Sequence, residues 1–296
     1  MTTTSYPYTR YLAAKKSVDD RAINRHVLAE LRRLMPTGEP RILEVGAGLG
    51  TMVARLLEWQ VISAGEYTLL DVDRQLLRDC REWLAAWATD RGLGVEHLPD
   101  GVRVGDVRVR LVAAEIADYA GRGRGEPADL LIANAVLDLV DVPTVLPALL
   151  RLLAPGGPYW FTINYDGETV FQPEHPLDGE IMRAYHRDMD ERVRYGRPAG
   201  DSRTGRRLFG HLRAAGAPAL ASGPSDWIVH AGPDGTYPHD EAYFVDRIVQ
   251  TIQDALEDRV NPAELADWAI ARRRQLASGE LVYLAHQLDF VGRWPS

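Results

Sequence analysis

Short apolar runs alternate with amphipathic segments over residues 41–166 of the chain. The runs contain few polar residues, as expected of strands that are buried on both faces of a sheet. The segments between them repeat apolar residues at helical spacing. The pattern therefore predicts βαβ units and an α/β fold with a doubly wound, mostly parallel sheet and helices on both faces. The predicted strands cover 41–45, 67–72, 107–114, 130–133 and 159–164, and the helices between them begin near 52, 74 and 143.

The two flanking regions are predicted to be mainly helical. Residues 1–40 form an N-terminal helical cap in this prediction, with Asp19 and Asp20 as candidate N-caps. We expect a single domain over 1–296, in which 41–166 is the ligand-binding core and 167–296 covers the substrate with a late helical insertion before the final strand. Beyond residue 166 the predicted helices are 178–194, one near 208–212, 239–258 and 262–277, and the predicted strands are 226–230 and 281–291.

A glycine-rich turn, Gly46-Ala47-Gly48-Leu49-Gly50, follows the first predicted strand. Glycine permits positive φ and lets a ligand contact the backbone, and open parallel sheets bind ligands at the carboxyl ends of their strands. The spacing is not the dinucleotide pattern G-x-G-x-x-G, because position 51 is threonine, and no Gly-Lys-Ser/Thr follows to make a P-loop. Glu44 precedes the turn, and its charge would repel a pyrophosphate but suits a cationic ligand.

With this turn and four later motifs, the sequence resembles the class I (Rossmann-like) S-adenosylmethionine-dependent methyltransferases. Residues 44–50 resemble their first motif, 69–73 the second, 114–116 the third, 128–137 the fourth, and LRLLAPGG at 150–157 the turn before the fifth strand. The resemblance implies that 41–166 is a cofactor-binding core, that S-adenosylmethionine is the cofactor and that Asp71 holds its ribose. It implies these cofactor-binding residues: Glu44, Gly46, Ala47, Gly48, Gly50, Asp71, Val72, Glu115, Ile116 and Asn134.

The chemistry of this cofactor agrees with the residues present. A sulfonium nucleotide with an amino-acid tail needs a close backbone approach, a carboxylate for the ribose diol and a polar strand end near the sulfur. The glycine turn, Asp71 and Asn134 supply these three. Other interpretations stay open: Asp71 as a helix cap, Asn134 as a turn residue, and Glu115 as a solvated strand end with Asp118 as its competitor.

The methyl acceptor has to be sought in the flanking segments. Many relatives place a histidine near position 138, where this chain has aspartate, and no N-P-P-[YFW] motif follows the fifth strand, which argues against DNA modification. The predicted catalytic residues are Tyr165, Glu168 and His175, with Glu174 and His186 as further candidate bases. Basic and aromatic side chains suit an anion clamp and a π-lined pocket. The predicted acceptor-binding residues are Tyr11, Lys15, Arg203, Arg206, Arg207 and Trp227.

The sequence therefore favours a methyltransferase that acts on a small molecule, either anionic or from secondary metabolism. A prenyl diphosphate C-methyltransferase is the specific case that would use an anion clamp, an aromatic pocket and a carboxylate base together. Two alternatives remain: a non-catalytic cofactor-binding scaffold, and an NAD-dependent oxidoreductase, against which the glycine spacing counts.

Composition excludes several other classes. The net charge of −8 argues against nucleic-acid binding. The single cysteine, Cys80, excludes a disulfide scaffold and a multi-cysteine metal site, and no metal site is predicted. No apolar run reaches the roughly 20 residues that cross a bilayer, and the N-terminal segment lacks the apolar core of a secretory signal. We therefore expect a cytoplasmic protein without membrane contact, with a homodimer as an open possibility.

Overall fold

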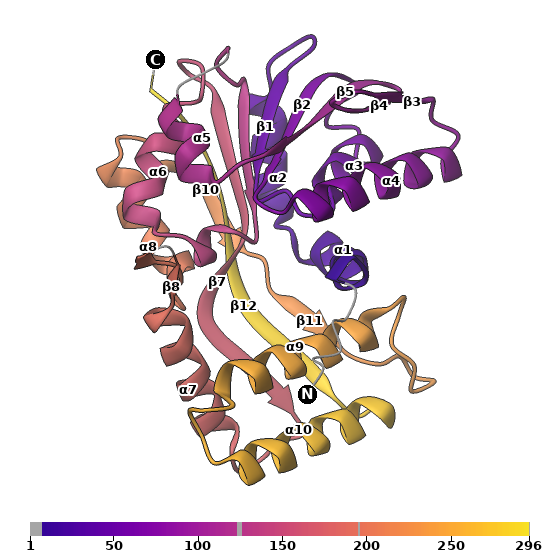
Figure 1. The fold of residues 1–296 in the computed structure, drawn as a ribbon, viewed down its shortest axis with the longest axis vertical. Coiled ribbons are helices and arrows are strands. Elements are labelled where there is room, and N and C mark those ends of the chain that lie inside the picture. The colour runs from indigo at the N-terminus through magenta and orange to yellow at the C-terminus, as the bar shows by residue number, and fades with distance from the viewer. Residues whose placement is uncertain (1–7, 123–125, 195, 296) are drawn as a thin grey trace.

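The computed structural model describes residues 8–122, 126–194 and 196–295 (Figure 1). One large sheet forms its centre, with strand order β10-β12-β7-β6-β1-β2-β5-β4-β3, and β11 pairs with β12 beside this path. A separate hairpin joins β8 and β9. The strands are β1 (Arg41–Val45), β2 (Ala64–Asp71), β3 (Val95–Leu98), β4 (Gly101–Val104), β5 (Asp106–Ala113), β6 (Leu130–Asn134), β7 (Pro158–Gln172), β8 (Val193–Arg194), β9 (Arg197–Pro198), β10 (Ala219–Pro224), β11 (Trp227–Val229) and β12 (Val282–Arg293).

Five of these strands are parallel, in the order β5-β2-β1-β6-β7. The chain builds outward from β1 through β2 to β5 and then returns to the other side of β1 with β6 and β7. The point between β1 and β6 is therefore the topological switch point, where open α/β sheets bind ligands at the carboxyl ends of the strands. The strand β12 is antiparallel to β7, β10 and β11. The predicted doubly wound, mostly parallel sheet is confirmed.

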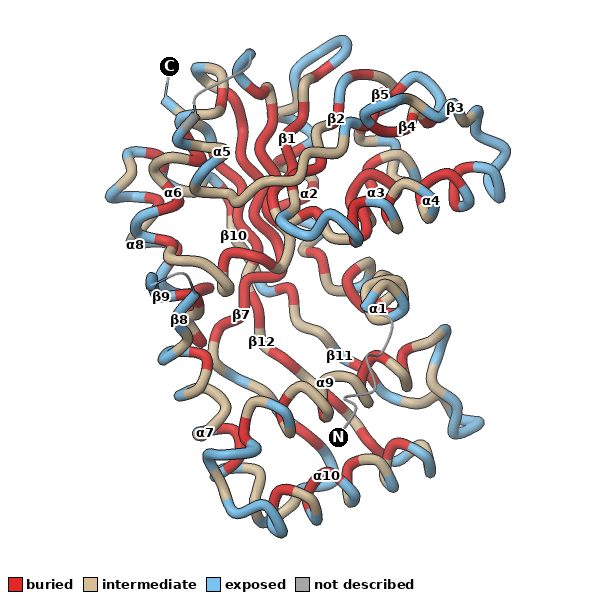
Figure 2. Tube along the Cα trace, viewed as in Figure 1, coloured by how far each residue is buried: buried red, intermediate tan, exposed pale blue. Residues whose placement is uncertain are grey.

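Helices cover both faces of this sheet, and Figure 2 shows the central strands buried between them. The helices α2, α3 and α4 pack on one face through residues such as Val27, Leu56 and Leu84. The helices α6 and α8 pack on the other through Leu146 and Leu212, with α5 beside them. The helices are α1 (Tyr8–Ala22), α2 (Arg25–Leu34), α3 (Thr51–Glu58), α4 (Arg74–Asp90), α5 (Ile116–Arg122), η1 (Leu137–Leu139), α6 (Val142–Leu150), α7 (Asp178–Glu191), α8 (Thr204–Ala214), α9 (Glu241–Leu256) and α10 (Pro262–Ala277).

A second layer is built on the far ends of two long strands. Figure 1 shows β7 and β12 running out of the main sheet toward α7, α9 and α10. These elements share a core in which Phe171 and Tyr283 from the strands meet Trp268 and Phe244 from the helices. The late helical insertion predicted from the sequence is thus a substantial covering layer below the carboxyl ends of the parallel strands.

The N-terminal helical region differs from the prediction. It is two helices, and Asn24 caps the second by accepting hydrogen bonds from the backbone nitrogens of His26 and Val27. Asp19 and Asp20 lie within α1 and cap nothing, because their carboxylates face the buried Arg55 of α3. The β3–β4 hairpin, α5, the β8–β9 hairpin and β10 were not predicted from the sequence.

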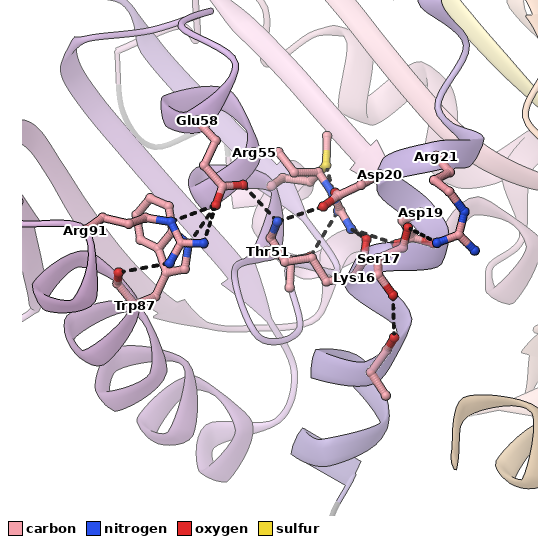
Figure 3. A network of polar contacts seen from close by, with 12 residues as sticks. Lys16, Ser17, Asp19, Asp20, Arg21, Thr51, Arg55, Glu58, Trp87 and Arg91 are labelled. Carbon is pink, nitrogen blue, oxygen red and sulfur yellow. Dashed lines mark hydrogen bonds and ion pairs between the residues drawn. The ribbon is translucent and has the colours of Figure 1, made fainter. Parts of the chain in front are cut away.

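A chain of charged contacts ties α1 to the main sheet's helices (Figure 3). The fully buried guanidinium of Arg55 contacts Asp20 and lies 3.2 Å from Asp19 Oδ2. Lys16 Nζ lies 2.8 Å from both Asp20 Oδ2 and Glu58 Oε2. Because one buried cation serves two acids of α1, this helix is held against α3. Its Leu12 lies beside Gly48 of the glycine turn.

Among the described residues, no helix combines the length and the apolarity that crossing a bilayer requires. The described part of the chain also holds no group of three or more histidine, cysteine or acidic side chains close enough to bind a metal ion.

Candidate active site

A cavity of about 1330 Å³ opens at the carboxyl ends of the parallel strands. On one side it is lined by the glycine turn, the end of β2 and the residues that follow β5 and β6. On the other side it is lined by α1, the outer parts of β7 and β12, and the insertion. The cavity therefore joins the topological switch point to the covering layer.

The glycine turn adopts a conformation that side chains would disrupt. Gly46, Gly48 and Gly50 have φ values of +64°, +56° and +73°. A Cβ atom on Gly46 would lie 2.3 Å from Val136 Cγ2, and one on Gly50 would lie 2.8 Å from Cys80 Sγ. Backbone geometry and close packing thus both require glycine here, and the turn exposes its main chain to the cavity.

Asp71 links the end of β2 to this turn. Its Oδ2 accepts a hydrogen bond of 2.8 Å from the backbone nitrogen of Gly48, and its Oδ1 accepts one of 3.0 Å from the nitrogen of Asp73. The N-cap of α4 is Asp73, not Asp71. Asp71 is therefore not a helix cap; it lines the cavity, and so does the exposed side chain of Val72.

The other predicted cofactor residues on strand ends also reach the cavity. Glu115, Ile116 and Asn134 line it, and so does Asp118, the competitor of Glu115. Thr162 Oγ1 donates to Asn134 Oδ1 over 2.8 Å, which fixes the orientation of the amide. Next to Asn134, Ala135 has a φ of +53°, a strained conformation for a residue with a side chain and one that is common at functional sites.

Glu44 and Gly50 are the two predicted cofactor residues that the structure keeps away from the cavity lining. Glu44 is buried on the face of the sheet below α3, where Tyr67 donates its hydroxyl hydrogen to Glu44 Oε2 over 2.8 Å. Burial raises the pKa of Glu44 to about 8. Its position corrects the prediction: Glu44 belongs to the interior beneath the turn. Residues two apart on a strand point to the same face of the sheet, so Glu44 lies on the same buried face as Ile42.

Three predicted acceptor residues, Tyr11, Lys15 and Trp227, line the covering half of the cavity. Lys15 Nζ lies 3.1 Å from Asp19 Oδ2 and 5.3 Å from the centre of the Trp227 ring. Trp227 Nε1 donates to Asp19 Oδ1 over 2.8 Å. The side chain of Lys15 is thus already neutralised and held against an aromatic wall.

Of the predicted catalytic residues, only Tyr165 reaches the cavity. Its hydroxyl lies 2.6 Å from His186 Nε2 and 2.8 Å from Thr169 Oγ1. Burial lowers the pKa of His186, which favours the neutral imidazole behind Tyr165. Glu168, Glu174 and His175 lie outside the cavity lining, and the backbone nitrogen of His175 donates a hydrogen bond of 2.8 Å to Asp178 Oδ2 near the start of α7.

The predicted anion clamp is not assembled at the cavity. Arg203, Arg206 and Arg207 lie at the start of α8, outside the lining. Arg206 donates from its backbone nitrogen and from Nε to Asp166 Oδ1, over 2.7 and 2.9 Å, and Arg207 lies 2.8 Å from Asp201. Two of the three arginines are therefore occupied by acids of this chain.

The structure adds functional candidates that the sequence analysis did not select. Asp138, in η1 just after β6, lines the cavity, and its Oδ1 is buried without a hydrogen-bond partner. Burial raises the pKa of Asp138 to about 6. Arg194 and Arg197, on the β8–β9 hairpin, and Tyr185 of α7 line the cavity as well. In the sequence, Asp138 could have been found from its position shortly after a strand end. Arg194 and Arg197 could have been found from the arginine-rich stretch 192–197 around Gly196.

Comparisons with known proteins place the chain near a group of methyltransferase structures. No family model matches the sequence, and no curated protein does. Among solved structures, it is similar to an S-adenosyl-L-homocysteine-bound SAM-dependent methyltransferase from Thiobacillus denitrificans, at 16% identity over 97% of this chain and 98% of that one, with a TM-score of 0.48. It is also similar to an S-adenosyl-L-homocysteine-bound SAM-dependent methyltransferase from Geobacter sulfurreducens. The identity is 15% over 97% of this chain and 98% of that one, and the TM-score is 0.47.

A third similar structure is phosphoethanolamine N-methyltransferase 2 from Haemonchus contortus in complex with S-adenosyl-L-methionine. The identity is 13%, the coverage is 99% of this chain but 59% of the other, and the TM-score is 0.46. Identities and TM-scores this low do not assign residues or an acceptor, so the function has to come from the geometry of the cavity itself.

Proposed function

We propose that this protein is an S-adenosylmethionine-dependent methyltransferase that acts on a small molecule. The observation that carries the proposal is the Gly48–Asp71 hydrogen bond of 2.8 Å, which joins a positive-φ glycine turn to a carboxylate at the switch point of the sheet. A dinucleotide enzyme would place a pyrophosphate against this turn, and the nearby carboxylate of Asp71 disfavours that charge.

The residues present fit the cofactor in type and position. The main chain of the glycine turn suits the amino-acid tail, Asp71 suits the ribose diol, and the exposed apolar side chain of Val72 offers a surface for the adenine. Glu115 and Asn134 provide polar groups at the neighbouring strand ends. When bound, S-adenosylmethionine supplies an electrophilic methyl group and leaves as S-adenosylhomocysteine.

The covering half of the cavity is where the acceptor binds in this proposal. Tyr11, Tyr185 and Trp227 provide aromatic walls, and α1 closes the side next to the glycine turn. These residues align the acceptor with the methyl group and exclude water, which is most of what an in-line displacement requires of a protein.

Asp138 is the proton acceptor in the proposed reaction. An amine or hydroxyl acceptor loses its proton as its heteroatom forms the new bond to the methyl carbon, and the unpartnered Oδ1 of Asp138 takes that proton. The pKa of about 6 leaves this carboxylate ionised at neutral pH yet basic enough to act. Asp138 replaces the predicted catalytic residues Glu168 and His175, which do not reach the cavity.

Calorimetric titration of the purified chain with S-adenosylmethionine, S-adenosylhomocysteine and NAD tests the cofactor. We expect saturable binding of the first two and none of NAD. A folded protein that binds neither sulfur nucleotide, or that binds NAD in their place, would overturn the proposal.

Turnover separates an enzyme from a cofactor-binding scaffold. Release of S-adenosylhomocysteine is measured with acceptor panels of small amines, phenols and carboxylic acids, and we expect acceptor-dependent release. Tight cofactor binding without release from any panel would favour the scaffold.

A further inference from the structure

Two arginines face each other across the smallest sheet of the structure. Arg194 of β8 and Arg197 of β9 are directly opposed Cα partners in an antiparallel hairpin that contains only these two short strands. Like charges in directly opposed positions destabilise such a pair. Both residues are exposed, and both line the cavity. The hairpin therefore places two positive charges at the opening of the proposed acceptor site.

The other cations of the cavity wall are already neutralised by acids of this chain. Lys15 pairs with Asp19 at 3.1 Å, and Arg192 pairs with Asp188 at 2.8 Å. Among the residues that the structure describes, no carboxylate pairs with Arg194 or Arg197. These two guanidinium groups thus stay uncompensated in a protein whose net charge is −8.

We propose that Arg194 and Arg197 bind an anionic group of the methyl acceptor, either a phosphate or a carboxylate. This inference rests on the proposed function and adds a substrate class to it. Guanidinium groups form paired hydrogen bonds with the oxygens of both anions, and a bound anion would remove the repulsion between the two opposed charges. In this proposal Arg194 and Arg197 take the role that the sequence predicted for Arg203, Arg206 and Arg207, because Arg206 and Arg207 are held by Asp166 and Asp201.

The arrangement of charges along the cavity defines the rest of the acceptor. Asp138 follows the end of β6, and it lines the same cavity as Tyr185 and the two arginines. An acceptor that fits has a protic nucleophile for Asp138, an anionic group for the arginines, and an apolar or aromatic body.

Binding of small aromatic probes to the full chain saturated with S-adenosylhomocysteine tests this inference. Phenyl phosphate, phenylacetate and neutral benzyl alcohol are titrated by calorimetry at fixed pH and ionic strength. We expect one or both anions to bind more tightly than the alcohol. In the double variant Arg194→Gln/Arg197→Gln, we expect anion affinity to fall about tenfold or more, while affinity for the alcohol and for S-adenosylhomocysteine is unchanged. The two anions identify which group is preferred.

The matched control is Arg183→Gln/Arg187→Gln, which removes the same charge from exposed positions on α7 outside the cavity lining. An equal loss in this control would show a general charge effect and overturn the inference. It would also be overturned if the hairpin variant lost S-adenosylhomocysteine affinity to the same extent, or if the unmodified protein bound S-adenosylhomocysteine but did not prefer the anions. Failure of the proposed function is distinct, because it appears as absent S-adenosylhomocysteine binding in the unmodified protein.

Discussion

Tyr67 donates its hydroxyl hydrogen to Glu44 Oε2 over 2.8 Å, and both side chains are buried beneath the glycine turn. Burial raises the pKa of Glu44 from 4.5 to about 8, even though Tyr67 and Arg55 both favour the ionised form. The folded state therefore holds this proton more tightly than the unfolded chain does. The contribution of Glu44 to the free energy of unfolding falls as the pH rises from about 4.5 to about 8.

We expect Glu44→Gln to remove this pH dependence, because glutamine stays neutral and its amide oxygen still accepts from Tyr67. Relative to the unmodified protein, the variant gains about 3 kcal/mol of stability between pH 5.5 and 8.5. Urea unfolding at the two pH values measures the difference. The control is Glu66→Gln, on the exposed side of β2. If Glu44→Gln and Glu66→Gln showed the same pH dependence, Glu44 would not be the titrating group.

The glycine turn gives a steric prediction. Gly46→Ala puts a Cβ atom 2.3 Å from Val136 at a φ of +64°, whereas Gly105→Ala has a similar φ of +56° with no atom within 4 Å. Backbone strain alone costs about 1–2 kcal/mol. We expect Gly105→Ala to lose roughly that much stability, and Gly46→Ala to lose more and also to lose cofactor binding. Thermal unfolding and S-adenosylhomocysteine titration test this, and equal effects of the two substitutions would contradict it.

Asp71, the proposed ribose-binding carboxylate, gives an affinity prediction. Asp71→Ala removes a charged acceptor from a ligand diol, so S-adenosylmethionine binding is expected to weaken by about 1–3 kcal/mol. Asp71→Asn keeps an oxygen for the Gly48 nitrogen and is expected to retain the fold of the turn while still losing affinity. Calorimetry measures both variants. Unchanged affinity in Asp71→Asn would show that the carboxylate only supports the glycine turn and does not bind the cofactor.

The sequence was sufficient to predict the elements with strong hydrophobic periodicity. The helix predicted over 262–277 has those bounds in the structure, because Asn261 caps it and Pro262 occupies its first turn. The strands β1 and β6 and the first part of β7 were equally clear, since their apolar runs are buried on both faces. The β3–β4 hairpin was missed because the residues of β3 are half-buried or exposed and form no apolar run.

The cofactor half of the site was easier to predict than the acceptor half, for a physical reason. The glycine turn, Asp71 and Asn134 lie where their own strands end, so local sequence fixes their position. Whether an arginine of the insertion reaches the cavity depends on partners far along the chain. Arg206 is held by Asp166, forty residues away, and no local pattern reveals that pairing.

The buried contact between α1 and α3 predicts a large loss of stability. Arg55→Met leaves Asp19 and Asp20 without the buried guanidinium that both contact, and breaking a buried pair costs about 3–5 kcal/mol. Arg33→Met removes an ion pair with Glu30 in which Arg33 is 69% exposed, and we expect it to cost less than about 1 kcal/mol. Urea unfolding compares the two, and a small loss for Arg55→Met would mean that α1 is held mainly by apolar packing.

Asp138 gives a prediction for the pH dependence of catalysis. Burial raises its pKa to about 6, and a base acts only when it is ionised, so kcat with any acceptor found should decline as the pH falls below about 6. Asp138→Asn should lower kcat by about 10²–10⁴-fold at neutral pH and leave S-adenosylhomocysteine affinity unchanged, because the amide cannot take the proton. Glu168→Gln, at a position outside the cavity lining, should keep both the kcat of the unmodified protein and its decline at low pH. An Asp138→Asn variant that retained the rate and the pH profile would remove Asp138 from the reaction, and the Tyr165–His186 pair would then be the next group to test.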